Sequence, residues 1–315
     1  MAGTTPSFPN LLSSGPAHRA MRRARLTHPR ARRRQIYEFA AEGPTLRSVA
    51  ADFVARLGSR AAVPGEVRSH WGVPEYVELM AREEGIADEL RRIASGDARA
   101  LRRLNPERLL ALLRALARPP AAELNKARLA AASGIPATTI SPYLEVLVEV
   151  GLLRLLPGCR ASVAKRVIGR PRAILTDPAV ARHLSGATVD ELVELRGRSR
   201  LAPLLTGVVV DELLRQRETS AVDYRLSHLR ERNGLAVDLV VELPDDTVYG
   251  LEVRTAASLR PHQFAGLEAL AARAGWRFRG GVVLNTGSAG HEFRPGLWGL
   301  PISALWDWDA TPPGR

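Results

Sequence analysis

Two carboxylates and an arginine occur in the segment LAVDLVVELPDDTVYGLEVR, where apolar and polar residues alternate on both sides of a Pro-Asp-Asp turn. This alternation is typical of two strands joined as a hairpin. If the two apolar sets share a face, the tightest register pairs Leu243 with Thr247 across a three-residue loop. The same register places Asp238 opposite Glu252, with Arg254 two residues further along the same side. Two facing carboxylates repel each other, so we expect a divalent cation or Arg254 to neutralise them.

Facing carboxylates of this kind form the core of PD-(D/E)xK nuclease sites, where they hold Mg²⁺ and a nearby lysine helps to position or activate water. In this chain the third position is Arg254. Because arginine stays protonated, it can stabilise a phosphate but cannot act as a base. The residues therefore leave two interpretations open. One is a weak Mg²⁺ site at Asp238 and Glu252, and the other is a polar sheet face neutralised by its own arginine.

A winged helix is predicted by the segment LNKARLAAASGIPATTISPYLEVLVEVGLLRLLP. Asn125 can cap a first helix over residues 126–133, Gly134 makes the turn, and a second helix starts near Thr138 or Thr139. The start of that second helix carries hydroxyls suited to phosphates or base edges: Thr138, Thr139 and Ser141. Cations of the following wing complete the candidate nucleic-acid-binding set: Arg154, Arg160, Lys165, Arg166, Arg170 and Arg172. The alternative is a helix-turn-helix that serves only in packing between domains.

The overall charge indicates a polyanionic partner. The 315 residues carry a formal net charge of +12 and have a sequence pI of about 11.0, which favours nucleic acid. Nearly all the cations are arginine, however, and GC-rich coding produces the same bias. No apolar stretch approaches the length of a membrane span. The single cysteine, Cys159, allows no internal disulfide and fits a reducing cytoplasm.

The two lysines bear on nucleotide binding. A phosphate-binding Walker A loop needs Gly-Lys followed by Ser or Thr. Neither Lys126 nor Lys165 follows a glycine. The stretch that begins at Val208, VVVDELLRQ, imitates a Walker B strand, but an amphipathic helix fits it better. We therefore expect no ATPase site in this chain.

From about Leu109 to Trp306 the chain resembles the C-terminal domain of unknown function carried by a large family of prokaryotic AAA-type ATP-binding proteins. The resemblance runs through the winged-helix segment, KRVIGRPRAILTDPAV, LLTGVVVDELLRQ and the hairpin, then through PHQFAGLEALAARAGWRFRGGVVLNTG to GLPISALW. Just upstream, WGVPE is similar to the family's G-G-x-P-E element. The resemblance implies a restriction-endonuclease-type fold that normally follows an ATPase module.

The family's nuclease-like site implies catalytic roles for Asp238, Glu252, Arg254 and the helix acid Glu212. Three positions depart from the family pattern. Thr206 stands where the helix usually has Glu, Ala236 replaces the first acid of E-V-D, and Arg254 replaces the Lys of E-V-K. Fewer acids leave less negative charge to hold a divalent ion, so we expect the site to be degenerate.

These patterns predict an α/β fold, with a helical N-terminal remnant and a winged helix before a restriction-endonuclease-like mixed β-sheet flanked by helices. The expected divisions are a basic, disordered arm over 1–36, a helical remnant or linker of the missing ATPase module over 37–118, the winged helix over 119–175, a PD-(D/E)xK-like domain over 176–308 and a tail over 309–315.

We expect a cytoplasmic, DNA-associated and non-catalytic protein, a truncated relative of the AAA-type family that binds DNA through the winged helix and the basic arm. One alternative is a metal-dependent nuclease that uses Asp238 and Glu252. Another is a docking subunit for a separate ATPase. No membrane partner is expected, and Mg²⁺ is the one cofactor considered.

Calorimetric titration of the purified chain with Mg·ATP is expected to show no binding at micromolar concentration. The physical reason is that no glycine-rich loop and following lysine are available to cradle the phosphates. Micromolar binding that maps to this polypeptide would contradict the prediction.

Overall fold

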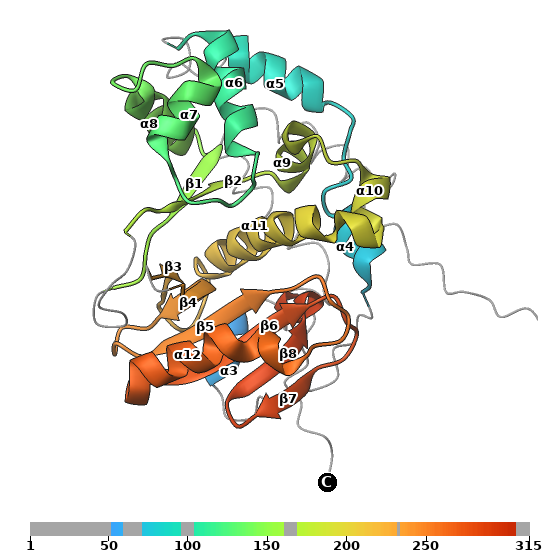
Figure 1. Ribbon diagram of the computed structural model, residues 1–315, viewed down its shortest axis with the longest axis vertical. Coiled ribbons are helices and arrows are strands. Elements are labelled where there is room, and N and C mark those ends of the chain that lie inside the picture. Colours follow the sequence, from blue (N-terminus) through green and yellow to red (C-terminus); the bar gives the residue numbers. More distant parts are fainter. Residues whose placement is uncertain (1–51, 59–70, 96–103, 161–168, 232–233, 307–315) are drawn as a thin grey trace, which may run out of the picture. The chain divides into compact units, whose positions relative to one another are not determined.

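Figure 1 shows the chain as a computed structural model, which describes residues 52–58, 71–95, 104–160, 169–231 and 234–306. Helices and a mixed sheet make it an α/β protein, which confirms the fold class expected from the sequence. The predicted basic arm over 1–36, the tail over 309–315, Lys165 and Arg166 lie outside the described residues. Among the helices in the described ranges, none is long and apolar enough to cross a membrane.

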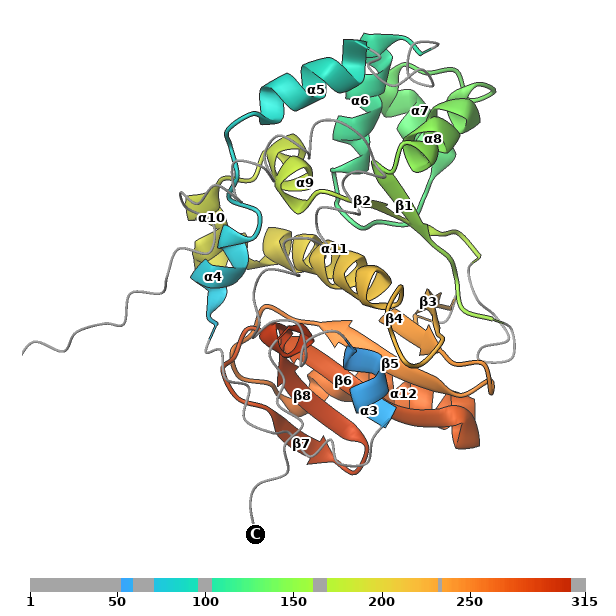
Figure 2. The same ribbon diagram turned by 180° about the vertical axis from the view of Figure 1, so that it is seen from behind.

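The larger sheet in the described part of the chain has six strands in the order β3-β4-β5-β6-β8-β7. They are β3 (Arg225–Arg230), β4 (Ala236–Glu242), β5 (Val248–Val253), β6 (Phe278–Asn285), β7 (His291–Arg294) and β8 (Leu297–Pro301). The pairs β3–β4, β4–β5 and β7–β8 are antiparallel, whereas β5–β6 and β6–β8 are parallel. The sheet is therefore mixed, and Figure 2 shows it from behind.

The β4–β5 hairpin has the register predicted from the alternation of apolar and polar residues. Leu239 pairs with Leu251 at one end of the ladder. At the other end the Leu243 amide donates to the Thr247 carbonyl at 2.9 Å and closes the loop. Residues that lie opposite each other in this hairpin were therefore predictable from local spacing alone.

Two helices cover opposite faces of the sheet, α11 (Arg198–Gln216) and α12 (Ala265–Ala274). Leu239 and Leu251 belong to the apolar cluster that contains the buried residues of α11. Val240, the next residue along β4, belongs to a second cluster with Leu267 of α12. At Gly250 an added Cβ would lie 2.7 Å from Leu267 Cδ2, so α12 approaches the sheet closely there. Successive residues of a strand thus face different helices.

The part of the chain before the sheet is helical for most of its described length. Besides α11, its helices are α3 (Phe53–Gly58), α4 (Val73–Glu78), α5 (Ile86–Ser95), α6 (Pro106–Leu116), α7 (Lys126–Ser133), α8 (Ile140–Glu149), α9 (Pro178–Ser185) and α10 (Val189–Val193). A single 3-10 turn, η2 (Leu195–Gly197), precedes α11, and three more lie among or after the strands of the sheet: η3 (Pro261–Phe264), η4 (Gly275–Arg277) and η5 (Ile302–Leu305). Asp177 caps α9 by accepting hydrogen bonds from the amides of Ala179 and Val180 at 2.8 and 3.1 Å.

Two helices joined by a short turn, α7 (Lys126–Ser133) and α8 (Ile140–Glu149), lie where the sequence predicted them. Asn125 accepts a hydrogen bond from the Arg128 amide at 3.0 Å, and Gly134 ends α7 with a φ of 65°. Such a left-handed conformation is strained for residues with a Cβ, which explains the glycine. An antiparallel pair follows, β1 (Leu153–Leu156) and β2 (Arg172–Leu175). This order of elements is compatible with a winged helix.

The earliest described residues pack against the C-terminal part of the chain. Phe53 in α3 is buried, and its amide donates to Gln216 Oε1 in α11 at 3.0 Å. Trp71 stacks on Trp306, with ring centroids 5.4 Å apart. These contacts make the N-terminal helical region a contributor to the core, beyond the linker role expected from the sequence.

Candidate functional site

The predicted acid pair lies at the end of the β4–β5 ladder, on the face covered by α12. Asp238 and Glu252 come one position beyond the Leu239–Leu251 pair. Glu252 is only 3% exposed and lies beneath the first turn of α12. A Cβ added to Gly266 in that turn would meet Glu252 Oε1 at 2.6 Å. The helix therefore closes over this carboxyl group.

Arg254 donates hydrogen bonds to both carboxyls of the pair. One terminal nitrogen lies 3.1 Å from Asp238 Oδ2, and the other lies 2.6 Å from Glu252 Oε2. The amide of Val253 also donates to Asp238 Oδ2 at 3.1 Å. This geometry is that of the neutralised sheet face, the second of the two interpretations of the sequence.

A second arginine, Arg172, also contacts the acid pair. Its Nη1 donates to Asp238 Oδ1 at 3.2 Å and to the Asp238 backbone carbonyl at 3.3 Å. The sequence suggested an exposed cation of the wing, whereas the side chain of Arg172 is only 13% exposed. The reason is that β2 runs close to the start of β4, a proximity that local spacing did not reveal. We call Arg172, Asp238, Glu252 and Arg254 the acid–arginine cluster.

The two carboxyls of the acid–arginine cluster differ in their tendency to ionise. Burial and the neighbouring charge of Asp238 raise the pKa of Glu252 to about 8, although Arg254 opposes the shift. Burial alone would also raise the pKa of Asp238. Attraction to Arg172, the hydrogen bond with Glu252 and the donor amide of Val253 instead hold the pKa of Asp238 below its ordinary value. Near neutral pH Asp238 is therefore ionised and Glu252 retains its proton.

The acid–arginine cluster does not fit a divalent metal. Mg²⁺ needs ionised oxygen ligands with room for octahedral coordination. Here both carboxyls accept hydrogen bonds from Arg254, and α12 covers Glu252. Arg172 and Arg254 also repel any further cation. Within the described ranges, no group of three or more His, Cys, Asp or Glu side chains is placed to hold a metal.

Glu212, the proposed helix acid, is not brought to the acid pair, because α11 packs on the opposite face of the sheet. Its carboxylate accepts hydrogen bonds from Arg215 Nε at 2.9 Å and from Gln216 Nε2 at 2.7 Å. Thr206 is buried on the same helix and donates to the Ala202 carbonyl at 3.0 Å. The expected catalytic group of Glu212 with Asp238 and Glu252 is therefore not formed.

Most of the described wing cations are engaged in ion pairs. Arg154 lies 3.1 Å from Asp211, and Arg160 lies 3.3 Å from Glu242. Arg170 is exposed. With Arg172 held in the acid–arginine cluster, the described wing offers less unpaired positive charge than the sequence suggested.

The start of α8 is the open end of the helix-turn-helix. Thr138 and Thr139 are exposed there, and Thr139 Oγ1 donates to the Pro136 carbonyl at 3.2 Å. Lys126 Nζ donates to Ser141 Oγ at 2.8 Å, which brings a cation to these hydroxyls. The sequence prediction missed Lys126, although its place at the start of the first helix was a usable signal.

Glu252→Gln is expected to flatten the dependence of stability on pH. The folded chain holds a proton on Glu252 up to about pH 8, whereas the unfolded chain releases it near 4.5. Stability contributed by this group is therefore complete below 4.5 and is lost as the pH rises through 8. Between about pH 7 and about 8.5, the natural chain should lose roughly 1–2 kcal/mol of unfolding free energy. Urea unfolding at several pH values measures this slope.

Glutamine keeps the shape of the side chain without the charge, so the slope should largely disappear in the variant. The window avoids the titration of His228, whose pKa is lowered by burial from 6.5. Glu292→Gln, at an exposed glutamate of β7, is the matched control and should retain the natural slope. Equal slopes in the Glu252→Gln variant and the natural chain would refute the assignment.

Comparisons with known proteins found two family models, both of unknown function. The domain of unknown function DUF8612 matches residues 72–191, and the domain of unknown function DUF4143 matches residues 203–305. DUF4143 is commonly a C-terminal domain of AAA-type ATPases. The crystal structure of protein VC1899 from Vibrio cholerae is similar at 14% identity with a TM-score of 0.23, covering 76% of this chain and 59% of that one. This chain thus spans less than two thirds of that protein. No curated protein matched the chain.

Proposed function

We propose that this chain associates with DNA through α7 and α8, and that the acid–arginine cluster stabilises the fold without cleaving DNA. The observation that carries the first part is the exposed start of α8, where Thr138 and Thr139 lie near the Lys126–Ser141 contact. In a helix-turn-helix, the N-terminal residues of the second helix contact base edges and the preceding helix crosses the phosphate backbone. The α7–α8 pair has the order and the exposed end that this role requires.

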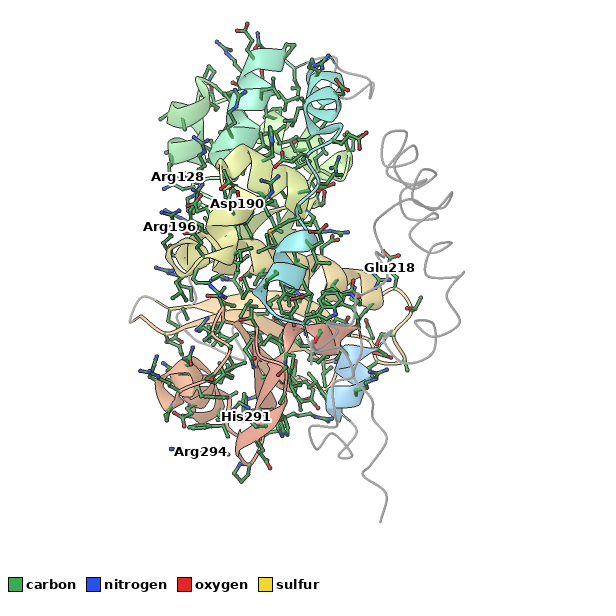
Figure 3. All side chains as sticks on the ribbon, turned by 90° about the vertical axis from the view of Figure 1, so that its right-hand side faces the viewer. Arg128, Asp190, Arg196, Glu218, His291 and Arg294 are labelled. Atoms are coloured by element: carbon green, nitrogen blue, oxygen red, sulfur yellow. The ribbon has the colours of Figure 1, made fainter. Side chains whose placement is uncertain are left out.

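The charges near α8 favour contacts with phosphates over base recognition. Glu145 and Glu149 are exposed along α8 and repel the DNA backbone. Positive charge comes instead from Lys126 and Arg128 of α7, and Figure 3 shows Arg128 at one edge of the molecule. Phosphate contacts carry no sequence information directly. We therefore propose binding that is salt-dependent and weakly selective.

Because most of the described wing cations are paired with carboxylates, we place the proposed DNA interface closer to α7 than to the wing. Arg154 and Arg160 already contact carboxylates, so DNA would have to compete for them. Exposed Arg170 and Lys126 are better placed to release counterions on binding. The second lysine of the chain, Lys165, lies outside the described residues.

The family match supports a second candidate function, docking to a separate ATPase. DUF4143 commonly accompanies an AAA-type ATPase module, and it matches a third of this chain. A cytoplasmic location would suit either partner. Co-purification with a Walker-containing protein in the absence of nucleic acid would favour docking over DNA binding.

Lys126→Glu is expected to weaken binding to duplex DNA roughly tenfold for all sequences, because it replaces a phosphate contact with a repulsive charge. The slope of log affinity against log salt should become shallower by about 0.9. Fluorescence anisotropy with two unrelated duplexes at several salt concentrations measures both effects.

Arg260→Glu makes the same change of charge at an exposed residue outside α7 and α8, and it should have little effect. Equal losses in the two variants would indicate a response to net charge alone. That outcome, or no binding by the natural chain, would rule out the proposed interface.

Supercoiled plasmid is expected to stay intact when the purified chain is added with Mg²⁺ or Mn²⁺. Two arginines occupy the carboxyls that a catalytic metal would need, and neither can accept a proton. Asp238→Asn is the matched control for contaminating nucleases, because it keeps the side-chain shape and removes the charge. Metal-dependent nicking by the natural chain that this variant lacks would establish a nuclease.

A further inference from the structure

A surface cavity of about 260 Å³ lies beside the start of α11, between the regions matched by the two family models. Its polar lining consists of Arg118, Ser185, Ser199 and Arg200. Three prolines contribute to its apolar wall: Pro119, Pro120 and Pro203. None of these residues belongs to the acid–arginine cluster or to α7 and α8, although Arg128 of α7 donates to the Arg118 carbonyl at 2.9 Å and makes the cavity a neighbour of that helix.

The two arginines that line the cavity also come together beside Gly186, next to the lining residue Ser185. Gly186 follows α9 with a φ of 76°, and a Cβ built on it would lie 3.1 Å from Arg118 Nη2. The same point is 4.0 Å from Arg200 Nη2. The missing side chain of Gly186 lets the Arg118 guanidinium pack closely there, near the guanidinium of Arg200 from a distant part of the chain.

Both guanidinium groups are held in place by the surrounding backbone. Arg118 Nε donates to the Leu184 carbonyl at 3.1 Å. Arg200 donates to the Ser185 carbonyl at 2.9 Å and to both oxygens of Glu191 at 2.8 and 2.7 Å. Among the described residues, none accepts a hydrogen bond from the terminal nitrogens of Arg118. That arginine therefore has donors available to a ligand in a fixed orientation.

The charges around the cavity favour an anion. Hydrogen bonding from Arg200 lowers the pKa of Glu191, so this carboxylate is ionised and offsets one of the two arginines. The positive charge of Arg118 is left without a neutralising carboxylate among the described residues. The first turn of the 19-residue helix α11 begins here, with no acidic residue in it and no side-chain cap at Gly197. The Arg198 amide already donates to the Leu195 carbonyl of η2, and the next amides of the turn add a partial positive charge to that of the arginine.

We propose that this cavity binds a small phosphate-bearing ligand. Guanidinium groups match the oxygens of a phosphate with paired, charge-assisted hydrogen bonds, and the Ser199 hydroxyl can add another. The proline wall would contact an attached organic group. A volume of about 260 Å³ lies near the lower end for small-molecule sites, which suits a compact phosphomonoester. This inference does not depend on the DNA-binding proposal.

The test is calorimetric titration of the full chain with inorganic phosphate at constant ionic strength. Ser199→Asp places a carboxylate at the second residue of α11, where a helix tolerates negative charge well, so the fold should be retained. We expect phosphate to bind the natural chain at least about tenfold more tightly than the Ser199→Asp variant, because the new carboxylate repels it. Arg118→Gln should give a similar loss.

Arg108→Gln, at an exposed arginine on α6 outside the cavity, is the matched control and should bind phosphate as the natural chain does. Circular dichroism melting verifies that each variant is folded. Phosphate affinity that is absent, or equal in the natural chain and the Ser199→Asp variant, would overturn the proposal. The proposal would also be overturned if the Ser199→Asp and Arg118→Gln variants weakened binding of duplex DNA but phosphate bound neither variant nor the natural chain. The cavity would then hold a phosphate of the DNA backbone.

Discussion

The ionised carboxylate of Asp238 holds together the strand pair β1–β2 and the main sheet. It accepts hydrogen bonds from Arg172 on β2, from Arg254 just after β5 and from the amide of Val253. One side chain thereby connects the strand pair β1–β2 with the main sheet. Removing either arginine would leave the partly buried charge of Asp238 less well compensated, which destabilises the folded chain. The neighbouring Glu252 avoids the same problem by keeping its proton.

Strand alternation decides which helix each hairpin residue meets, and it also decides the chemistry of the acid pair. Leu239 and Leu251 of the hairpin pack with α11, whereas Val240 packs with α12, and Glu252 lies on the α12 side as well. A helix acid such as Glu212 cannot join the acid pair across the sheet. The strand acids keep the facing arrangement expected from the sequence, whereas the surrounding packing favours a structural role.

The cations behind the net charge of +12 differ in whether a carboxylate already neutralises them. In the acid–arginine cluster and in most of the described wing, positive groups already have carboxylate partners. Lys126 and the terminal nitrogens of Arg118 are not paired with carboxylates in the described part of the chain. The two proposed binding surfaces are the regions around these groups, because an anion there need not displace a partner already bound.

The sequence of neighbouring residues determined the secondary-structure elements and the contacts within them. The alternation around the Pro-Asp-Asp turn predicted the hairpin register, and Asn125 before an apolar helical pattern predicted α7, because both depend on residues close in sequence. Tertiary packing alone decided the longer contacts. Arg172 reaches Asp238 across 66 residues, and α12 covers the acid pair while α11 does not. These outcomes follow from burying the apolar faces of all the elements together, which no local spacing encodes.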